Sequence, residues 1–225
     1  MPYNYTQFFD KIFCINLDSR PDRWKNCILE FDNLGLTNLV ERVSAFKMNP
    51  AIAGCSKSHI ECIKLAKERK YSRILIVEDD ITFHTDIFYK ILNESHKQLL
   101  NKKIDYDILY FSANLYGNSN KLIDTNLAKI TLAKAAHSYI LNSKVYDLIL
   151  NNYSKIDWDN EYNWQYSNKN RMNFDVWLKN IQELGNSYGV YPSIAEQKKG
   201  YSDLINMECS YNISNHYNKI LKDTL

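Results

Sequence analysis

The chain has 225 residues, with 45% hydrophobic and 24% charged residues, a composition typical of one medium globular domain with a buried core. Its formal net charge of +2 is too small to indicate nucleic-acid binding by bulk electrostatics, so we expect no nucleic-acid partner. No apolar run approaches the roughly 18 to 20 residues that span a bilayer, and the start MPYNYTQFFDK lacks the features of a signal peptide. Five scattered cysteines without a C-x-x-C pair predict reduced thiols and a cytoplasmic location.

Three apolar runs in the first third of the chain predict parallel strands. They lie at residues 11–17 (KIFCINL), 40–46 (VERVSAF) and 73–78 (RILIVE), and helical patterns separate them. The β-α-β-α-β order is typical of a parallel sheet with crossover helices. Ligands bind such sheets beyond the carboxyl ends of the strands, so we expect a site there.

The two crossover helices have recognisable start signals. In the first helix, Ser19 can cap, Pro21 suits the first turn, and Gly35 ends the pattern. The second helix is predicted to begin near Ser58, because Ser58 and Glu61 have the spacing of a capping box.

The second half is less regular. The sequence predicts, in chain order, a helix from residue 85 or 86 to about 100, a strand at 107–112, a loop over 113–127, a pair of strands at 129–133 and 136–141, helices at 143–152 and 174–184, an extended segment at 187–192 and a helix at 215–223. The stretch 153–170 is polar but rich in Trp and Tyr, which favours an ordered, mobile binding loop. We expect one domain, with a nucleotide-binding half (1–112) and an acceptor-side half (113–225).

Three consecutive acids, Glu78, Asp79 and Asp80, follow the apolar run of the third strand. Carboxylates this close repel one another, and none is stable in a dry core without a partner. They are either solvated at the strand end, or they hold a hard cation such as Mg²⁺ or Mn²⁺. The sequence contains neither G-x-G-x-x-G after the first strand nor G-K-[ST], so a bound diphosphate would depend on a metal and on side chains.

The stretch ILIVEDDIT is also similar to the D-x-D-x-[TV] motif of haloacid-dehalogenase-like phosphatases. In that family the first acid is an Asp nucleophile on the first strand, whereas here it is Glu78 on the third strand. The extra methylene would displace the attacking oxygen from in-line geometry, which makes the phosphatase the weaker alternative.

Several motifs together resemble glycosyltransferase family 25, which contains lipopolysaccharide glycosyltransferases and collagen galactosyltransferases. The motifs are INLDSRPDRW, GCSKSHIECIK and ILIVEDDITF, followed by looser matches in AHSYIL with SKVYDLIL and in AEQKKGYSDL. The resemblance covers about residues 11–205. It implies an α/β, GT-A-like nucleotide-sugar-binding fold with a mostly parallel central sheet flanked by helices. It also implies a nucleotide-sugar donor, a divalent metal, and transfer with inversion.

From these motifs we expect Glu78 and Asp80 to bind the metal, Mn²⁺ or Mg²⁺. The expected donor-binding residues are Asn16, Leu17, Asp18, Arg20, Arg23, Ser58, His59, Asp79, His137, Gln197 and Asp203. Asp175 in NFDVW is the candidate general base, and the alternative is that it only caps the helix that follows.

Some of these residues have plain structural alternatives. Arg20 and Arg23 are either solvated or contact the nucleotide. His59, placed in a helical first turn, is expected to be neutral and bonded to a ligand or to the acids. His137, in an apolar strand, fits a core histidine as well as a donor contact. Ser58 and His59 are not a hydrolase pair, because adjacent helical residues do not face each other.

The sequence therefore predicts an inverting, metal-dependent glycosyltransferase. It would move a hexose, galactose or glucose, from a UDP-sugar to a hydroxyl of a glycan or glycoprotein acceptor. The alternative from another class is a non-catalytic nucleotide-sugar-binding module. All three acids are present, which favours the enzyme, because a relative that has lost its activity usually loses such acids first.

Overall fold

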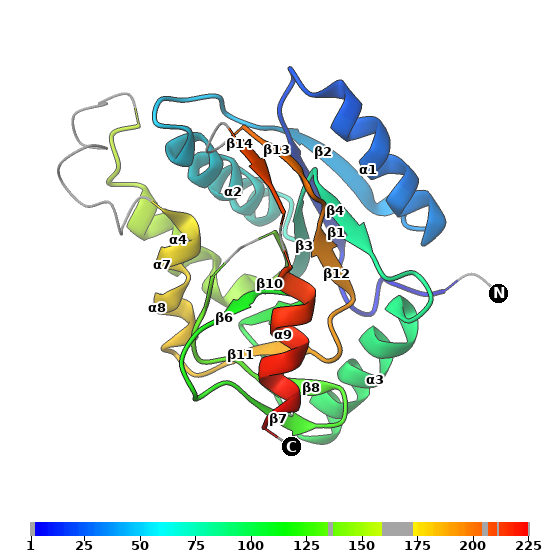
Figure 1. The fold of residues 1–225 in the computed structure, drawn as a ribbon. Coiled ribbons are helices and arrows are strands. Elements are labelled where there is room, and N and C mark those ends of the chain that lie inside the picture. The colour runs from blue at the N-terminus through cyan, green and yellow to red at the C-terminus, as the bar shows by residue number, and fades with distance from the viewer. Residues whose placement is uncertain (1–2, 135–136, 159–172, 204–206, 211, 225) are drawn as a thin grey trace.

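A computed structural model describes residues 3–134, 137–158, 173–203, 207–210 and 212–224. In this part of the chain an eight-stranded sheet lies between two layers of helices (Figure 1). The strands in spatial order are β2 (Val40–Ser44), β1 (Lys11–Asn16), β3 (Arg73–Glu78), β10 (Ser138–Asn142), β5 (Ile108–Tyr110), β11 (Ser187–Val190), β8 (Leu127–Lys129) and β7 (Lys121–Asp124).

The sheet is mixed, but most of its strands run in one direction. The pairings orient β2, β1, β3, β5, β11 and β7 one way, and β10 and β8 the other. The predicted α/β fold, with a mostly parallel central sheet flanked by helices, is confirmed. The predicted β-α-β-α-β order is also confirmed, because β1 pairs in parallel with both β2 and β3.

The central strands bury both of their faces, and each face of the sheet has its own helices. In β1, Ile12 and Cys14 pack into one apolar cluster, while Phe13 and Ile15 pack into the other. This alternation follows from the two-residue period of a strand. One face is covered by α1 (Pro21–Asn33) and α3 (Phe88–Asn101). The other face is covered by α2 (Ala51–Glu68), α4 (Tyr146–Tyr153), α7 (Phe174–Trp177), α8 (Lys179–Gln182) and α9 (Ile213–Lys222).

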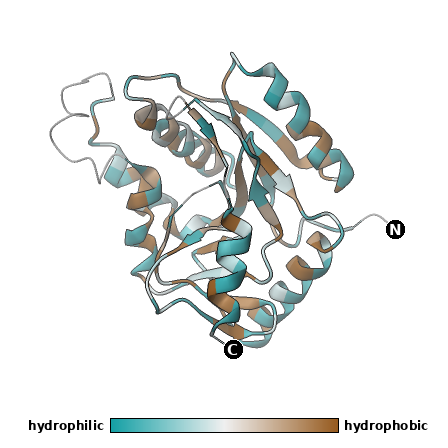
Figure 2. Ribbon diagram, viewed as in Figure 1, coloured by the Kyte–Doolittle hydropathy of each residue, from teal (hydrophilic) through white to brown (hydrophobic). Residues whose placement is uncertain are grey.

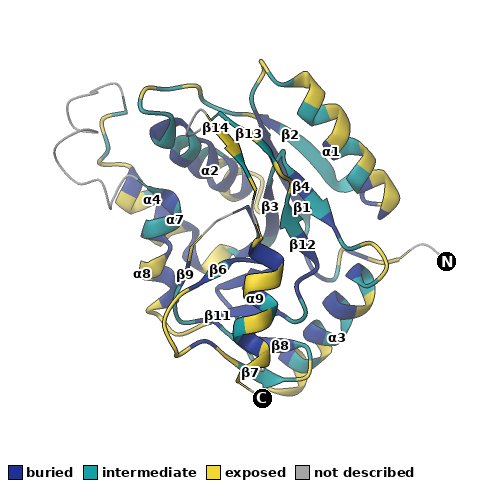
Figure 3. Cartoon of the chain, viewed as in Figure 1, coloured by how far each residue is buried: buried dark blue, intermediate teal, exposed yellow. Residues whose placement is uncertain are grey.

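The helices are amphipathic, as this packing requires. Hydrophobic residues gather on the sheet and on the helix faces that meet it (Figure 2). The exposed positions lie on the outer sides of helices such as α1 and α9 (Figure 3). Among the described residues, no helix combines the length and the apolar composition needed to cross a bilayer.

Helix α2 begins seven residues before the predicted start at Ser58, at Ala51. Ser58 is buried inside the helix, where its hydroxyl donates to the carbonyl oxygen of Gly54 at 2.7 Å and accepts from the amide of Phe46 at 2.9 Å. The capping-box spacing was misleading because this serine satisfies a tertiary contact. Ser19 likewise does not cap α1, whose N-cap is Arg20 without a side-chain hydrogen bond.

The predicted strand pair at 129–133 and 136–141 differs from the structure. The first run divides between β8 and β9 (Ala133–Lys134), whereas β10 pairs with β3 and β5. Residues 159–172, most of the predicted binding loop, lie outside the described residues. The remaining short elements are β4 (Ile81–Phe83), β6 (Asn114–Leu115), β12 (Ala195–Gln197), β13 (Gly200–Ser202), β14 (Met207–Cys209) and the 3₁₀ turns Thr37–Leu39 and Ser143–Val145.

A late segment of the chain returns to the edge of the sheet where β1 and β3 end. Strand β12 pairs antiparallel with β4, which places Gln197 opposite Ile81. The hairpin of β13 and β14 follows directly. This return brings Gln197 to Asp80 at the end of β3 and brings Asp203 to Arg20 at the start of α1.

Candidate active site

The three acids lie where β3 ends and turns into β4. Glu78 is the last residue of β3, and Asp79 and Asp80 form the turn. Because β1 and β3 are parallel, Ile15 lies opposite Glu78, and Asn16 follows at the same edge. The expected gathering of polar groups at the carboxyl ends of the strands is therefore present.

Both oxygens of Asp79 accept hydrogen bonds from the first part of the chain. Asn16 Nδ2 donates to Oδ2 at 2.7 Å, and Arg23 donates to Oδ1 at 2.8 Å. Only 10% of the Asp79 side chain is exposed, so these contacts satisfy a nearly buried carboxylate. Asp79 thereby ties α1 to the turn.

Asp80 has fewer partners. Its Oδ2 accepts from Gln197 Nε2 at 3.0 Å and lies 3.6 Å from the guanidinium of Arg23. Its Oδ1 is buried and accepts no hydrogen bond from the described part of the chain. Burial, followed by the charge of Glu78, raises the pKa of Asp80 to about 7. An unsatisfied buried carboxylate oxygen is unfavourable, so this atom favours a proton or a cation beside it.

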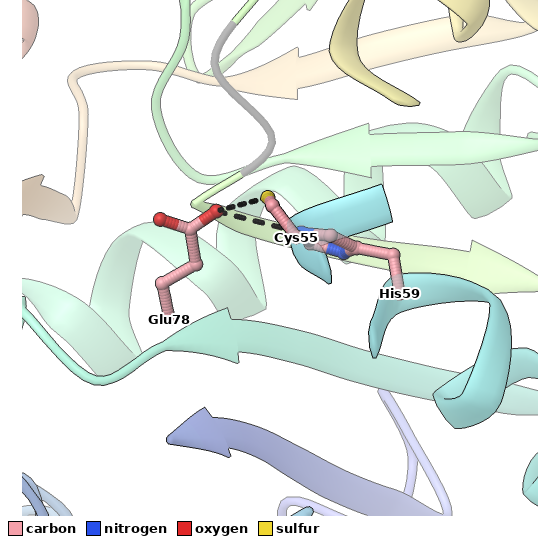
Figure 4. A group of neighbouring side chains, drawn as sticks. All are labelled: Cys55, His59 and Glu78. Atoms are coloured by element: carbon pink, nitrogen blue, oxygen red, sulfur yellow. Dashed lines mark hydrogen bonds and ion pairs between the residues drawn. The ribbon is translucent and has the colours of Figure 1, made fainter. Parts of the chain in front are cut away.

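Glu78 faces helix α2. Its Oε1 lies 3.4 Å from His59 Nε2 and 4.0 Å from Cys55 Sγ, and all three side chains point toward one another (Figure 4). Burial, followed by the negative charges of Asp175 and Asp79, raises the pKa of Glu78 to about 8. The side chain still keeps 27% of its exposure, so it is only partly withdrawn from water.

His59 is fully buried, and burial lowers its pKa to about 4. The imidazole is therefore neutral at neutral pH, as the sequence predicted, although it lies in the middle of α2 rather than in a first turn. Its Nδ1 shares a 2.9 Å hydrogen bond with the hydroxyl of Tyr139. The ring also stacks on Phe174, with centroids 4.8 Å apart and planes 7° apart. These contacts fix the ring with Nε2 toward Glu78.

Asp175 lies in the first turn of α7, but it is not the cap. The side chain of Asn173 caps this helix by accepting from the amides of Asp175 and Val176, so the capping alternative for Asp175 is wrong. The negative charge of Asp175 contributes to the raised pKa values of Glu78 and of the Cys55 thiol. Its carboxylate therefore belongs to the same group of acids.

The start of α1 is held against the late hairpin. Arg20 pairs with Asp203 at 2.5 Å, and Arg23 donates to the carbonyl oxygen of Tyr201 at 2.5 Å. Leu17 is half-buried, and its carbonyl oxygen accepts from the amide of Arg20. The two arginines are thus engaged with protein groups, not simply solvated.

A pocket of about 310 Å³ lies beside this region. It is lined by Asn16, Asp18, Pro21, Trp24 and Arg42. Asp18 accepts from Arg42 at 2.5 Å, and Arg42 also donates to Asn16 Oδ1 at 2.7 Å. Asn16 therefore connects the pocket with Asp79.

Two predicted donor-binding residues are placed differently from the rest. Ser58 bonds to backbone groups of Phe46 and Gly54, so its hydroxyl is already used in the fold. His137 is buried just before β10, and its carbonyl oxygen accepts from the amide of Glu78 at 3.1 Å. Both residues help to position the site through the backbone.

The sequence interpretation missed Cys55, Tyr139 and Arg42. Cys55 precedes His59 by four residues, a spacing that puts both side chains on one face of a helix. That signal was hidden because the helix was predicted to begin at Ser58. Cys55, His59 and Glu78 bring three ligand atoms within 4.8 Å of one another, so this group could hold a metal ion.

The chain matches no protein-family model and no curated protein. Solved structures with a similar fold include A197 from STIV, with a TM-score of 0.48 and 10% identity over 90% of this chain and 94% of that one. Another is a glycosyltransferase involved in the glycosylation of the major capsid of PBCV-1, with a TM-score of 0.39 and 10% identity over 70% of this chain and 73% of that one. A third, from Bacillus anthracis, is assigned as a glucose-1-phosphate thymidylyltransferase, with a TM-score of 0.32 and 14% identity over 62% of this chain and 55% of that one. At TM-scores below 0.5, these likenesses establish neither a family nor an activity for this chain.

Proposed function

We propose that this protein is a metal-dependent glycosyltransferase that moves a hexose, galactose or glucose, from a UDP-sugar to a hydroxyl of a glycan or glycoprotein, with inversion. The main support is the pair of acids Glu78 and Asp80 at the carboxyl end of β3, where Asp80 has a buried oxygen without a hydrogen-bond partner among the described residues. The motif resemblance to glycosyltransferase family 25 points in the same direction.

The acids fit a divalent cation. Glu78 and Asp80 both have raised pKa values, because burial and the negative charges of neighbouring acids disfavour their ionised forms. A cation between or beside them would remove that penalty. When bound, a divalent ion would stabilise the charge that develops on the departing nucleoside diphosphate. We assign its binding to Glu78 and Asp80.

The pocket lined by Pro21, Trp24 and Arg42 suits the nucleoside part of the donor. Its volume of about 310 Å³ is at the lower end of the range for small-molecule sites. Pro21 and Trp24 offer apolar walls, while Asp18 and Arg42 offer hydrogen-bonding groups. Since Asn16 lines this pocket and also bonds Asp79, a nucleoside bound here would direct its phosphates toward the acids.

Inversion requires a base on the acceptor side. Asp175 is our candidate, because it is not needed as a helix cap and because it lies in the acid group. It would accept the proton of the acceptor hydroxyl as that oxygen attacks the anomeric carbon. Arg20 and Arg23 would remain near the diphosphate, oriented by Asp203 and Asp79.

The test is a screen of UDP- and GDP-sugars with Mn²⁺, measuring release of the nucleoside diphosphate with and without glycan acceptors. We expect release from a UDP-hexose in the wild type and in Asp223→Asn, a matched change of an exposed acid at the end of α9. Binding of UDP without turnover of any donor would instead identify a non-catalytic binding module. Calorimetry adds a second measurement, because equal UDP affinity with Mn²⁺ and after chelation would remove the metal from the proposal.

A further inference from the structure

The possible metal ligands around Glu78 include a sulfur and a nitrogen atom as well as oxygen. Such a mixed set of ligands favours some metal ions over others. The group of Cys55, His59 and Glu78 offers a thiol, an imidazole and a carboxylate within 4.8 Å of one another. Mg²⁺ prefers oxygen ligands with octahedral geometry, whereas sulfur and nitrogen ligands favour Zn²⁺ and related transition metals. A site for a hard cation alone would not need the sulfur and the ring nitrogen.

We propose that Cys55, His59 and Glu78 form a binding site for a borderline-soft divalent cation of the Zn²⁺ or Co²⁺ type. This site shares Glu78 with the cation position that we assign to Glu78 and Asp80, but Asp80 is not one of its ligands. The inference therefore goes beyond the proposed function and rests on it only for the role of the ion in transfer. Binding would release the thiol proton of Cys55 to solvent, because the thiolate is the ligand.

The spacing suits such an ion. Ligands of a tetrahedral zinc ion lie roughly 3.2 to 3.6 Å apart, given bond lengths of about 2.0 to 2.3 Å. The observed separations from Glu78 Oε1 are 3.4 Å to His59 Nε2 and 4.0 Å to Cys55 Sγ. The third separation, from Cys55 Sγ to His59 Nε2, is within 4.8 Å, so the sulfur would have to move inward to bind the ion. Figure 4 shows the three side chains converging from α2 and β3.

The imidazole is already oriented as a ligand. Metal-binding histidines commonly use one ring nitrogen for an outer partner, which fixes the tautomer and the ring. Here Tyr139 holds Nδ1 at 2.9 Å, and stacking on Phe174 holds the plane. This arrangement leaves Nε2 on the side of Glu78 and Cys55.

The backbone also brings Cys55 to the site. A Cβ atom on the preceding residue, Gly54, would lie 2.0 Å from the carbonyl oxygen of Phe46. Glycine therefore allows the first turns of α2 to approach the segment after β2 closely. Three protein ligands leave a fourth position, as in catalytic zinc sites, and Cys55 and Glu78 are both partly exposed while His59 is buried.

The experiment is a titration of the full chain with Co²⁺ under a non-thiol reductant, followed by absorbance. We expect an intense near-ultraviolet thiolate-to-cobalt band, and Zn²⁺ should remove it stoichiometrically while a large excess of Mg²⁺ should not. Cys55→Ser should abolish the band. Cys62→Ala, a change of a buried cysteine on the same helix, should keep it. Tyr139→Phe should weaken cobalt binding about 10-fold, because it removes only the outer partner of His59.

Thermal unfolding without metal shows whether each variant is folded. Cobalt binding without a thiolate band, or a band that survives in Cys55→Ser, would overturn the proposal. The result is separable from glycosyl transfer by Asp80→Asn, which we expect to keep the band. If Asp80→Asn loses donor turnover but keeps the cobalt band, the result bears on the proposed function and leaves the metal site at Cys55 in place. If the wild type turns over donor with Mn²⁺ but shows no thiolate-to-cobalt band, the proposed site at Cys55, His59 and Glu78 is wrong and the proposed function is unaffected.

Discussion

The turn after β3 has two unlike sides. On the paired side, Asp79 uses both of its carboxylate oxygens to bind Asn16 and Arg23. On what we call the open side, Asp80 has one buried oxygen without a hydrogen bond among the described residues, and the pKa values of Glu78 and Asp80 are raised to about 8 and about 7. Neighbouring acids in one motif therefore have separate tasks. The paired side anchors helix α1 through Arg23, and the open side is where we propose that a cation binds.

The largest expected effect is on the open side. Asp80→Asn removes a carboxylate that we assign to the metal, so transfer should fall by about 10³-fold or more. Stability should be unchanged or higher, because the amide relieves repulsion with Glu78. Donor turnover and the thermal midpoint measure the two effects. A lower midpoint, with activity reduced only in proportion to the folded fraction, would place Asp80 on the paired side.

The next effect separates the base from the helix cap. Asp175→Asn should reduce transfer by about 10²-fold or more, since an amide cannot accept the proton. UDP binding with Mn²⁺ should persist, because Asp175 would face the acceptor. The matched variant is Asn173→Ala, which should lose about 1 kcal/mol of stability through the cap and keep most of the transfer activity. Near wild-type transfer by Asp175→Asn would show that another group is the base.

On the paired side the effect should fall on stability. Asp79→Ala leaves Arg23, whose side chain is 18% exposed, without its main partner. The free energy of unfolding should drop by about 3 kcal/mol, as is usual when one member of a largely buried pair is removed. Denaturant unfolding of Asp79→Ala beside Asp80→Ala measures the contrast. Equal losses from both would mean that the two sides of the turn do not differ.

The smallest effect is a pH dependence of the metal-free protein. Glu78 and Asp80 bind protons more tightly in the folded state than in the unfolded state, since burial raises both pKa values. Their contribution to stability is therefore complete below about pH 4 and is lost as the pH rises through 7 to 8. The thermal midpoint of the chelated protein should fall by about 5 °C between pH 5 and 8, more than in Glu78→Gln. Addition of a divalent ion should raise the thermal midpoint more at pH 8 than at pH 5. The opposite trend would argue against a cation at these acids.

Local patterns in the sequence predicted the sheet edge that carries the acids, because parallel strands leave a clear alternation with helices. They failed where tertiary contacts outweigh local rules. Ser58 and Glu61 have capping spacing, yet the Ser58 hydroxyl bonds Phe46 and Gly54 inside a helix that begins earlier. That error concealed the relation of Cys55 to His59. The pairing of Gln197 with Asp80 joins residues 117 apart, and no periodicity encodes such a contact.

The contact between Arg20 and Asp203 joins positions 183 residues apart, and it has a consequence for biosynthesis. As the chain emerges from a ribosome, β1 and β3 can pair early, because they are close in sequence and adjacent in the sheet. The contacts of Asp80 with Gln197 and of Arg20 with Asp203 can form only after translation has passed residues 197 and 203. A nascent chain halted before residue 195 would thus display the acids without their late partners. These two contacts of Asp80 and Arg20 are therefore completed only near the end of synthesis.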